Sequence, residues 1–246
     1  IKKPHATDGS IAEWTSDQFT QDKESEISYA IDNDANLFYV ALKVPNQRTQ
    51  MRMMRLGMDL FIDVKGKHKE NMFVEFPTKP SVGEGGGFGG GGGRRGGDNG
   101  EGGGRPDFSQ IRQQLAARLF NMKIDGFEGM QNEMVVGLNN DNGINVAFVW
   151  DEADVMYVEY AIPISSIGTK ANLTGKKISV GLKLNAPATN GQAGSNVSVA
   201  SPGAGMLGAR GGVARSTGGG MSSLGQAGPS SQMNELYIWA KYDMKF

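Results

Sequence analysis

The sequence predicts an all-β protein, an antiparallel β-sandwich of about nine strands with one or two helices in its connections and two long glycine-rich loop insertions. Segments that alternate apolar and polar residues, or form short apolar runs, recur along the chain as strands do. Helical spacing of apolar residues occurs in only two segments. Of the 37 glycines in 246 residues, 27 lie between Gly83 and Gly104 or between Gly191 and Gly228. The remaining residues have the composition of an ordinary globular domain.

The first third of the chain predicts two pairs of strands with a helix between them. Asp32 to Asn36 is rich in turn-forming residues and separates the first two apolar runs. Met51 and Met54 have helical spacing, and Gly57 is suited to ending a helix. The predicted elements are strands at 27–31 and 37–44, a helix at 47–56, and strands at 58–64 and 71–76.

An amphipathic helix is predicted at 107–122. Asp107 follows Pro106 and can accept hydrogen bonds from the amides of the first turn, as an N-cap does. The expected apolar face consists of Phe108, Ile111, Leu115, Leu119 and Met122.

The rest of the chain predicts strands only. Asn142-Gly143 lies between two apolar runs and is a strong signal for a hairpin turn. The last strand places Leu236 and Ile238 on one face and Tyr237 and Trp239 on the other. The predicted strands are 133–138, 144–150, 155–162, 176–184 and 235–246.

We expect one domain over residues 1–246, with glycine-rich insertions at 83–104 and 186–232. Gly and Ser composition is typical of flexible linkers. An alternative is that the two tracts contact each other or a partner, because glycine permits close approach of backbones. The residues expected to make such contacts are Phe88, Arg94, Arg95, Met206, Leu207 and Arg210.

Composition excludes several classes of function. The formal net charge of −1 argues against binding of nucleic acid over the whole surface, and the arginines of the first glycine tract are balanced by acids. The absence of Cys excludes disulfides, thiol nucleophiles and cysteine-bound metals. No apolar run approaches the length of a membrane span. The chain starts at Ile1, which fits either removal of a leader after export or a trimmed chain.

Four stretches together resemble the family 9 carbohydrate-binding modules and their DOMON-type relatives. They are Asp8-Gly-Ser-Ile-Ala-Glu-Trp14, Asp34-Ala-Asn-Leu-Phe-Tyr-Val40, Tyr157-Val-Glu-Tyr-Ala-Ile-Pro163 and Lys177-Ile-Ser-Val-Gly181. The resemblance implies an immunoglobulin-like sandwich in an exported protein, attached to enzymes or found near the outer-membrane machinery of bacteria. We therefore expect a periplasmic, outer-membrane-associated or extracellular location.

Trp150, Asp151, Glu152 and Asp154 form the predicted ligand site, because a ring beside carboxylates suits a sugar. A tryptophan at a strand end is also common in a core or an interface. Trp14 is expected to pack over one end of the sandwich, and Trp239 faces away from the predicted core.

The acidic and imidazole side chains give little support for catalysis or for a metal centre. Asp59, Asp63 and Glu159 lie within predicted strands, where acids are usually solvated. His5 and His68 are too few for a catalytic triad or a three-histidine metal centre. We expect no enzyme activity and no cofactor. A structural Ca²⁺ at Asp32, Asp34 and Asn36 is an alternative for that oxygen-rich turn.

The leading hypothesis is a non-catalytic, exported recognition or accessory module with a glycan as its ligand. The first alternative is a structural subunit that binds protein within a bacterial cell-surface or outer-membrane assembly through its glycine-rich loops. The second is a haem-binding domain of the DOMON type, although neither histidine lies in a predicted strand.

Overall fold

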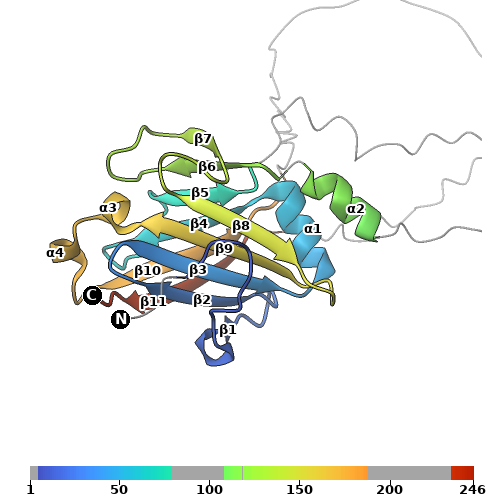
Figure 1. Ribbon diagram of the computed structural model, residues 1–246, viewed down its shortest axis with the longest axis horizontal. Helices are drawn as coiled ribbons and strands as arrows, with labels where there is room; N and C mark the ends of the chain where they lie inside the picture. Colours follow the sequence, from blue (N-terminus) through green and yellow to red (C-terminus); the bar gives the residue numbers. More distant parts are fainter. Residues whose placement is uncertain (1–4, 79–107, 118, 188–233) are drawn as a thin grey trace, which may run out of the picture. The chain divides into compact units, whose positions relative to one another are not determined.

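The computed structural model describes residues 5–78, 108–117, 119–187 and 234–246, and in these residues two antiparallel sheets pack face to face (Figure 1). The first sheet has the strand order β1 (Thr20–Gln21), β2 (Ser28–Asn33), β3 (Leu37–Val44), β9 (Met156–Pro163), β8 (Asn145–Trp150). The second has the order β11 (Leu236–Asp243), β10 (Lys177–Leu184), β4 (Met58–Asp63), β5 (Phe73–Phe76), β6 (Asn121–Asp125), β7 (Met134–Gly137). The predicted all-β sandwich is confirmed.

The core lies between the two sheets and is built from alternate residues of each strand. In β3, Phe38, Val40 and Leu42 face the second sheet and are buried. In β10, Val180 and Leu182 face the first sheet. All nine predicted strands are present, because period-2 alternation and short apolar runs are both local signals of a strand.

The helix predicted at 107–122 is wrong in its second half. The helix α2 spans Phe108–Ala116, and Asn121–Asp125 is the strand β6, which pairs with β5 and β7. Met122 and Ile124 are fully buried in the core as alternate residues of β6. Their period of two, with pairing on both sides, prevailed over the helical spacing that runs from Ile111 to Met122.

The hairpin predicted around Asn142-Gly143 is also wrong, although the turn itself forms. Gly143 has a φ of 75° and its amide donates to the carbonyl of Asn140. The strands on either side belong to different sheets, since β7 pairs with β6 and β8 pairs with β9. The turn therefore carries the chain from one sheet to the other.

The helices lie at the two ends of the sandwich (Figure 1). The helix α1 (Gln47–Leu56) has the predicted bounds and begins at Asn46, whose side chain accepts from the amides of Arg48 and Thr49. It lies beside α2 at one end, whereas α3 (Ile164–Ile167) and α4 (Lys170–Leu173) occupy the other. None of the described helices is long and apolar enough to cross a membrane.

The N-terminal segment covers the outer face of the first sheet. Trp14, which is buried, packs there with Tyr39 and Ala41 in a second apolar cluster. The indole Nε1 of Trp14 donates to Glu159 Oε1 over 2.9 Å, and the amide of Gly9 donates to Glu159 Oε2 over 3.0 Å. Trp14 packs against the sandwich as predicted, but its predicted place over one end is wrong, because the ring lies on the outer face of the first sheet.

Some predictions fall outside the described residues. They are the insertion at 83–104, the insertion at 186–232 from residue 188 onward, and the contact residues Phe88, Arg94, Arg95, Met206, Leu207 and Arg210.

Candidate ligand-binding face

Trp150 lies on the inner face of β8, beneath the helices α1 and α2. Its indole Nε1 donates to the side-chain oxygen of Gln50 in α1 over 3.0 Å. The guanidinium of Arg112 in α2 lies over the ring, 5.4 Å from its centre. On its own strand, Trp150 meets Phe148 edge-on at 5.5 Å. The ring is thus held by protein partners on several sides.

Gln50 and Arg112 link Asp154 to Trp150, since each of them contacts both residues. The other two predicted acids, Asp151 and Glu152, do not take part in this cluster. Arg112 pairs with the Asp154 carboxylate, and Gln50 Nε2 donates to the Asp154 carbonyl over 2.7 Å. Asp151 holds the turn between β8 and β9, because it accepts from the amides of Ala153 and Val155 and from the Tyr157 hydroxyl. Glu152 is exposed in that turn.

The carboxylates of the predicted calcium turn are bound to protein donors. Asp34 accepts from the amides of Asn36 and Leu37 and from the Tyr39 hydroxyl, at 2.6, 2.7 and 2.9 Å. Asp32 accepts from the Tyr242 hydroxyl at 3.1 Å. Within the described part of the chain, no three His, Cys, Asp or Glu side chains are grouped so that they could hold a metal ion.

The carboxylates considered for catalysis do not face one another. Asp59 and Asp63 lie on the outer face of the second sheet, whereas Glu159 lies on the outer face of the first, so the whole sandwich separates them. Asp63 accepts hydrogen bonds from the amides of Lys65, Lys67 and Lys69, which closes the turn after β4.

A row of aromatic side chains crosses the outer face of the second sheet. The register of β11, β10, β4 and β5 places Trp239, Gly181, Phe61 and Phe73 side by side. The rings of Trp239 and Phe61 are nearly parallel, with centres 6.0 Å apart and an angle of 19°. Phe73 meets Phe61 edge-on at 6.1 Å. We call Trp239, Phe61 and Phe73 the aromatic row.

Gly181 gives Trp239 its position. A Cβ at residue 181 would lie 2.6 to 2.8 Å from three atoms of the Trp239 ring, which is closer than van der Waals contact permits. The six-membered ring of the indole therefore lies against the backbone of β10 at Gly181. His68, in the turn after β4, stacks on the same indole at 4.6 Å and 12°. Trp239 remains partly exposed, whereas Phe61 is only 3% exposed.

A row of polar side chains runs parallel to the aromatic row, one step along the strands. We define this polar row by its register as Tyr237, Lys183, Asp59, Glu75 and Lys123. Lys183 lies 3.2 Å from Glu235 and 3.7 Å from Asp59, and its ammonium group lies over the Tyr237 ring.

The other lysine of the polar row has a similar environment. Lys123 pairs with Glu133 at 3.2 Å and its ammonium group lies 5.7 Å from the centre of the Phe73 ring. Tyr237 is 42% exposed. The face thus combines rings with hydrogen-bonding groups whose charges are balanced by close partners.

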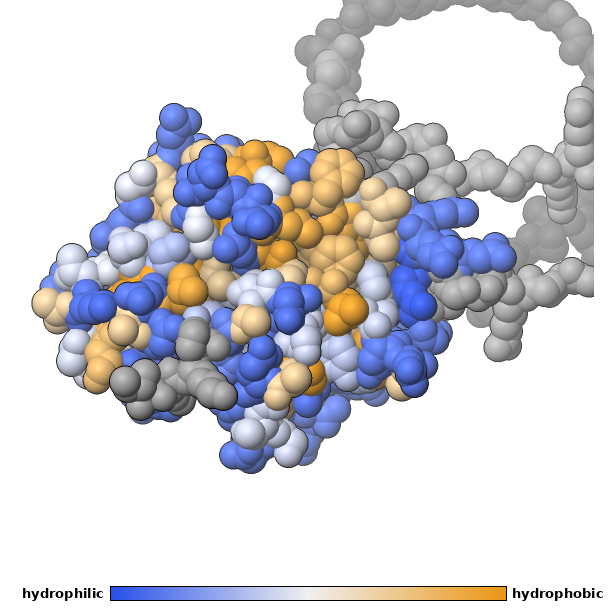
Figure 2. Space-filling model, in the orientation of Figure 1, coloured by the Kyte–Doolittle hydropathy of each residue, from blue (hydrophilic) through white to orange (hydrophobic). Residues whose placement is uncertain are grey.

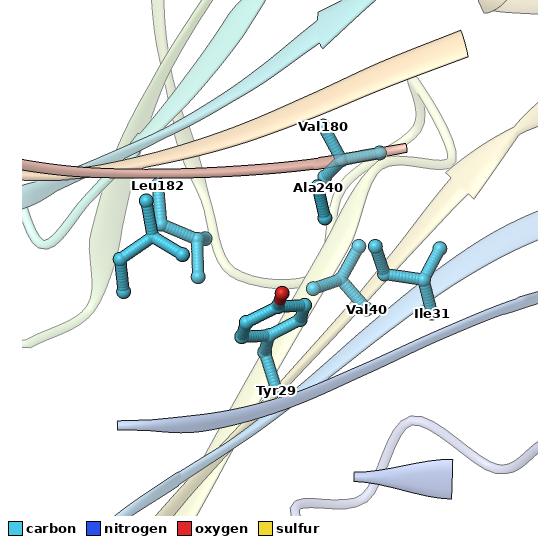
Figure 3. A pocket seen from close by; sticks show the side chains of 7 residues that line it. Tyr29, Ile31, Val40, Val180, Leu182 and Ala240 are labelled. Carbon is cyan, nitrogen blue, oxygen red and sulfur yellow. The ribbon is translucent and has the colours of Figure 1, made fainter. Parts of the chain in front are cut away.

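Two hollows in the described residues are less suited to a ligand than the outer face of the second sheet. An apolar crevice between the sheets is too narrow to hold a water molecule, and Figure 3 shows Tyr29, Val40 and Leu182 among the side chains that line it. A shallow hollow of about 450 Å³ lies next to α3, where Asn36, Pro163 and Lys170 contribute to its wall, but none of its lining residues is aromatic. Neither combines a ring with convergent polar groups.

Sequence reasoning placed Trp239 on the side away from the core but did not assign it to a site. The alternation around Phe61, between Leu60 and Ile62, held the same signal, since it puts a ring on the polar side of a strand. Gly181 and Phe73 join them only through strand register.

Comparison with family models, with curated proteins and with solved structures finds no match for this chain.

Proposed function

We propose that this chain is a non-catalytic recognition module that binds a glycan on the outer face of its second sheet. The observation that carries the proposal is the Trp239 ring, which packs against Gly181 and remains partly exposed beside the polar row. The CH groups of a pyranose contact the part of such a ring that stays exposed, while its hydroxyl groups bond to nearby side chains.

The arrangement is rigid before any ligand arrives. Gly181 fixes the depth of the indole, and both Phe61 and His68 stack against it. Each lysine of the polar row is held by a carboxylate and an aromatic ring. Binding to such a face orders few side chains, which lowers the entropic cost of association.

The charges of the face favour a neutral glycan. Lys183 and Lys123 are already paired, and the four carboxylates of Asp59, Glu75, Glu133 and Glu235 outnumber them. A sulfated or uronic-acid polymer would have to displace these carboxylates from the two lysines. A neutral sugar can instead accept from the ammonium groups and donate to the carboxylates.

An array of immobilised polysaccharides, probed with the full chain, tests the proposal. We expect binding to at least one neutral polysaccharide and weak or no binding to sulfated and uronate polymers. Tyr237→Ala should weaken binding, because this tyrosine borders the polar row. Tyr157→Ala is the matched control, since Tyr157 lies on the outer face of the opposite sheet. Equal binding by the two variants, or no binding by the wild type, would reject the proposal.

A further inference from the structure

The strand β8 forms an edge of the first sheet. It pairs with β9 on one side and with no described strand on the other. Figure 2 shows hydrophobic residues gathered on this side of the molecule, along β8 and next to α1. Val149 is 41% exposed there, and Phe148 and Trp150 are partly buried.

The register fixes which backbone groups of β8 point away from β9. The amide of Val146 donates to the carbonyl of Leu138 outside the sheet, so Val146 forms no ladder bonds with β9. Because hydrogen-bonded and non-bonded positions alternate in an antiparallel pair, Phe148 and Trp150 also point outward. Among the described residues, none bonds to the amide or carbonyl of Phe148 or Trp150.

The side chains of β8 do nothing to prevent pairing. Its six residues, Asn145 to Trp150, include no charged residue and no proline. Edge strands are usually protected by such residues, as Lys241 and Asp243 protect the edge strand β11 of the other sheet. An uncharged edge whose outward donors and acceptors bond to no described residue is a template for a further strand.

Acidic side chains flank β8 at both ends. Asp141 precedes the strand in the turn from β7, and Glu152 follows it in the turn to β9, and both are exposed. If two copies of the chain paired antiparallel through β8, Glu152 of one copy would approach Asp141 of the other. This like-charge contact disfavours a second copy as the occupant.

We propose that β8 receives an extended segment of another polypeptide, which adds a strand to the first sheet and carries lysine or arginine at its ends. The amides and carbonyls of Phe148 and Trp150 supply the backbone bonds. Asp141 and Glu152 select a basic partner. This surface is separate from the aromatic row, so the site stands whether or not a glycan binds.

Two synthetic peptides test the site: Lys-Thr-Val-Thr-Val-Thr-Lys and the same sequence with Glu at both ends. We expect the lysine-ended peptide to bind the full chain about tenfold more tightly than the glutamate-ended peptide, and less tightly as salt is added. Hydrogen exchange followed by NMR should show slower exchange at the amides of Phe148 and Trp150 and no change along β11. In the double variant Asp141→Lys/Glu152→Lys the preference should reverse.

A pair of substitutions at Phe148 separates backbone pairing from packing. Phe148→Pro removes an outward amide without removing a bond to β9, whereas Phe148→Ala keeps the amide and removes only the ring. Binding lost in the proline variant and retained in the alanine variant supports strand addition. The proposal is overturned if neither peptide binds, if protection appears along β11, or if the charge reversal leaves the preference unchanged. Self-association that protects the same amides without peptide would show that a second copy is the occupant instead.

Discussion

The indole of Trp239 lies over the backbone of Gly181, so close that any side chain at residue 181 would collide with the ring. This contact joins β11 to β10 on the face that we assign to the ligand. A glycine in the middle of a strand ordinarily weakens it, and here the absence of a Cβ makes room for the ring.

Gly181→Ala should displace Trp239 and lower the free energy of unfolding by about 1–3 kcal/mol. The methyl group would meet the ring at 2.6 Å, so the indole must lift from the sheet. Urea denaturation measures the loss, and near-UV circular dichroism should report the altered environment of the ring. Gly137→Ala in β7 is the control, because a Cβ there would come no closer than 3.5 Å to its nearest neighbour. A loss of the same size in both variants would contradict the explanation.

Gln50→Leu should destabilise the protein by about 2–4 kcal/mol. Gln50 is fully buried, donates to the carbonyls of Val44 and Asp154, and accepts from the Trp150 indole. Leucine fills the space but leaves these three groups without that partner. Thermal unfolding measures the effect, and Gln47→Leu at the exposed start of α1 should change stability by less than about 0.5 kcal/mol.

Glu159 should make the stability of the protein fall between about pH 4.5 and pH 7. Burial raises the pKa of its carboxyl from 4.5 to about 7, although the bonds from Trp14 and Gly9 favour the ionised form. Between these values the folded chain holds a proton that the unfolded chain has released. The stabilising contribution is therefore complete below pH 4.5 and is lost as the pH rises through 7.

The expected loss from Glu159 is about 1–2 kcal/mol after allowance for solvent screening. Urea denaturation at pH 5 and pH 8, compared between the wild type and Glu159→Gln, isolates this group, because all other carboxyls are common to both proteins. The wild type should lose more stability than the variant between the two pH values. An equal change in both proteins would exclude Glu159 as the cause.

The strands could be predicted because alternation is a local property, but β6 shows where local patterns compete. Ile111, Leu115, Leu119 and Met122 keep helical spacing across the point where the chain changes from helix to strand. Only the pairing of β6 with β5 and β7 decides between the two patterns.

The ligand-binding face was harder to predict than the strands, because its position depends on which face of each strand is buried. Along β8 both alternate sets are apolar, Val146, Phe148 and Trp150 on one side and Ala147 and Val149 on the other. The sequence therefore did not indicate that Trp150 points inward. The aromatic row brings residues 61, 73 and 239 together around Gly181, and their proximity is a property of register across four strands.

The measurement that tests the central claim most directly is isothermal titration calorimetry of Trp239→Ala and Trp150→Phe with the neutral polysaccharide that binds most strongly on the array. The account predicts that Trp239→Ala weakens binding about tenfold or more, whereas Trp150→Phe changes it by less than about twofold. Trp150 is the matched control, because its ring lies beneath α1 and α2 rather than on the ligand face. Full affinity in the folded Trp239→Ala variant, or a loss confined to Trp150→Phe, would contradict the assignment of the glycan to the outer face of the second sheet.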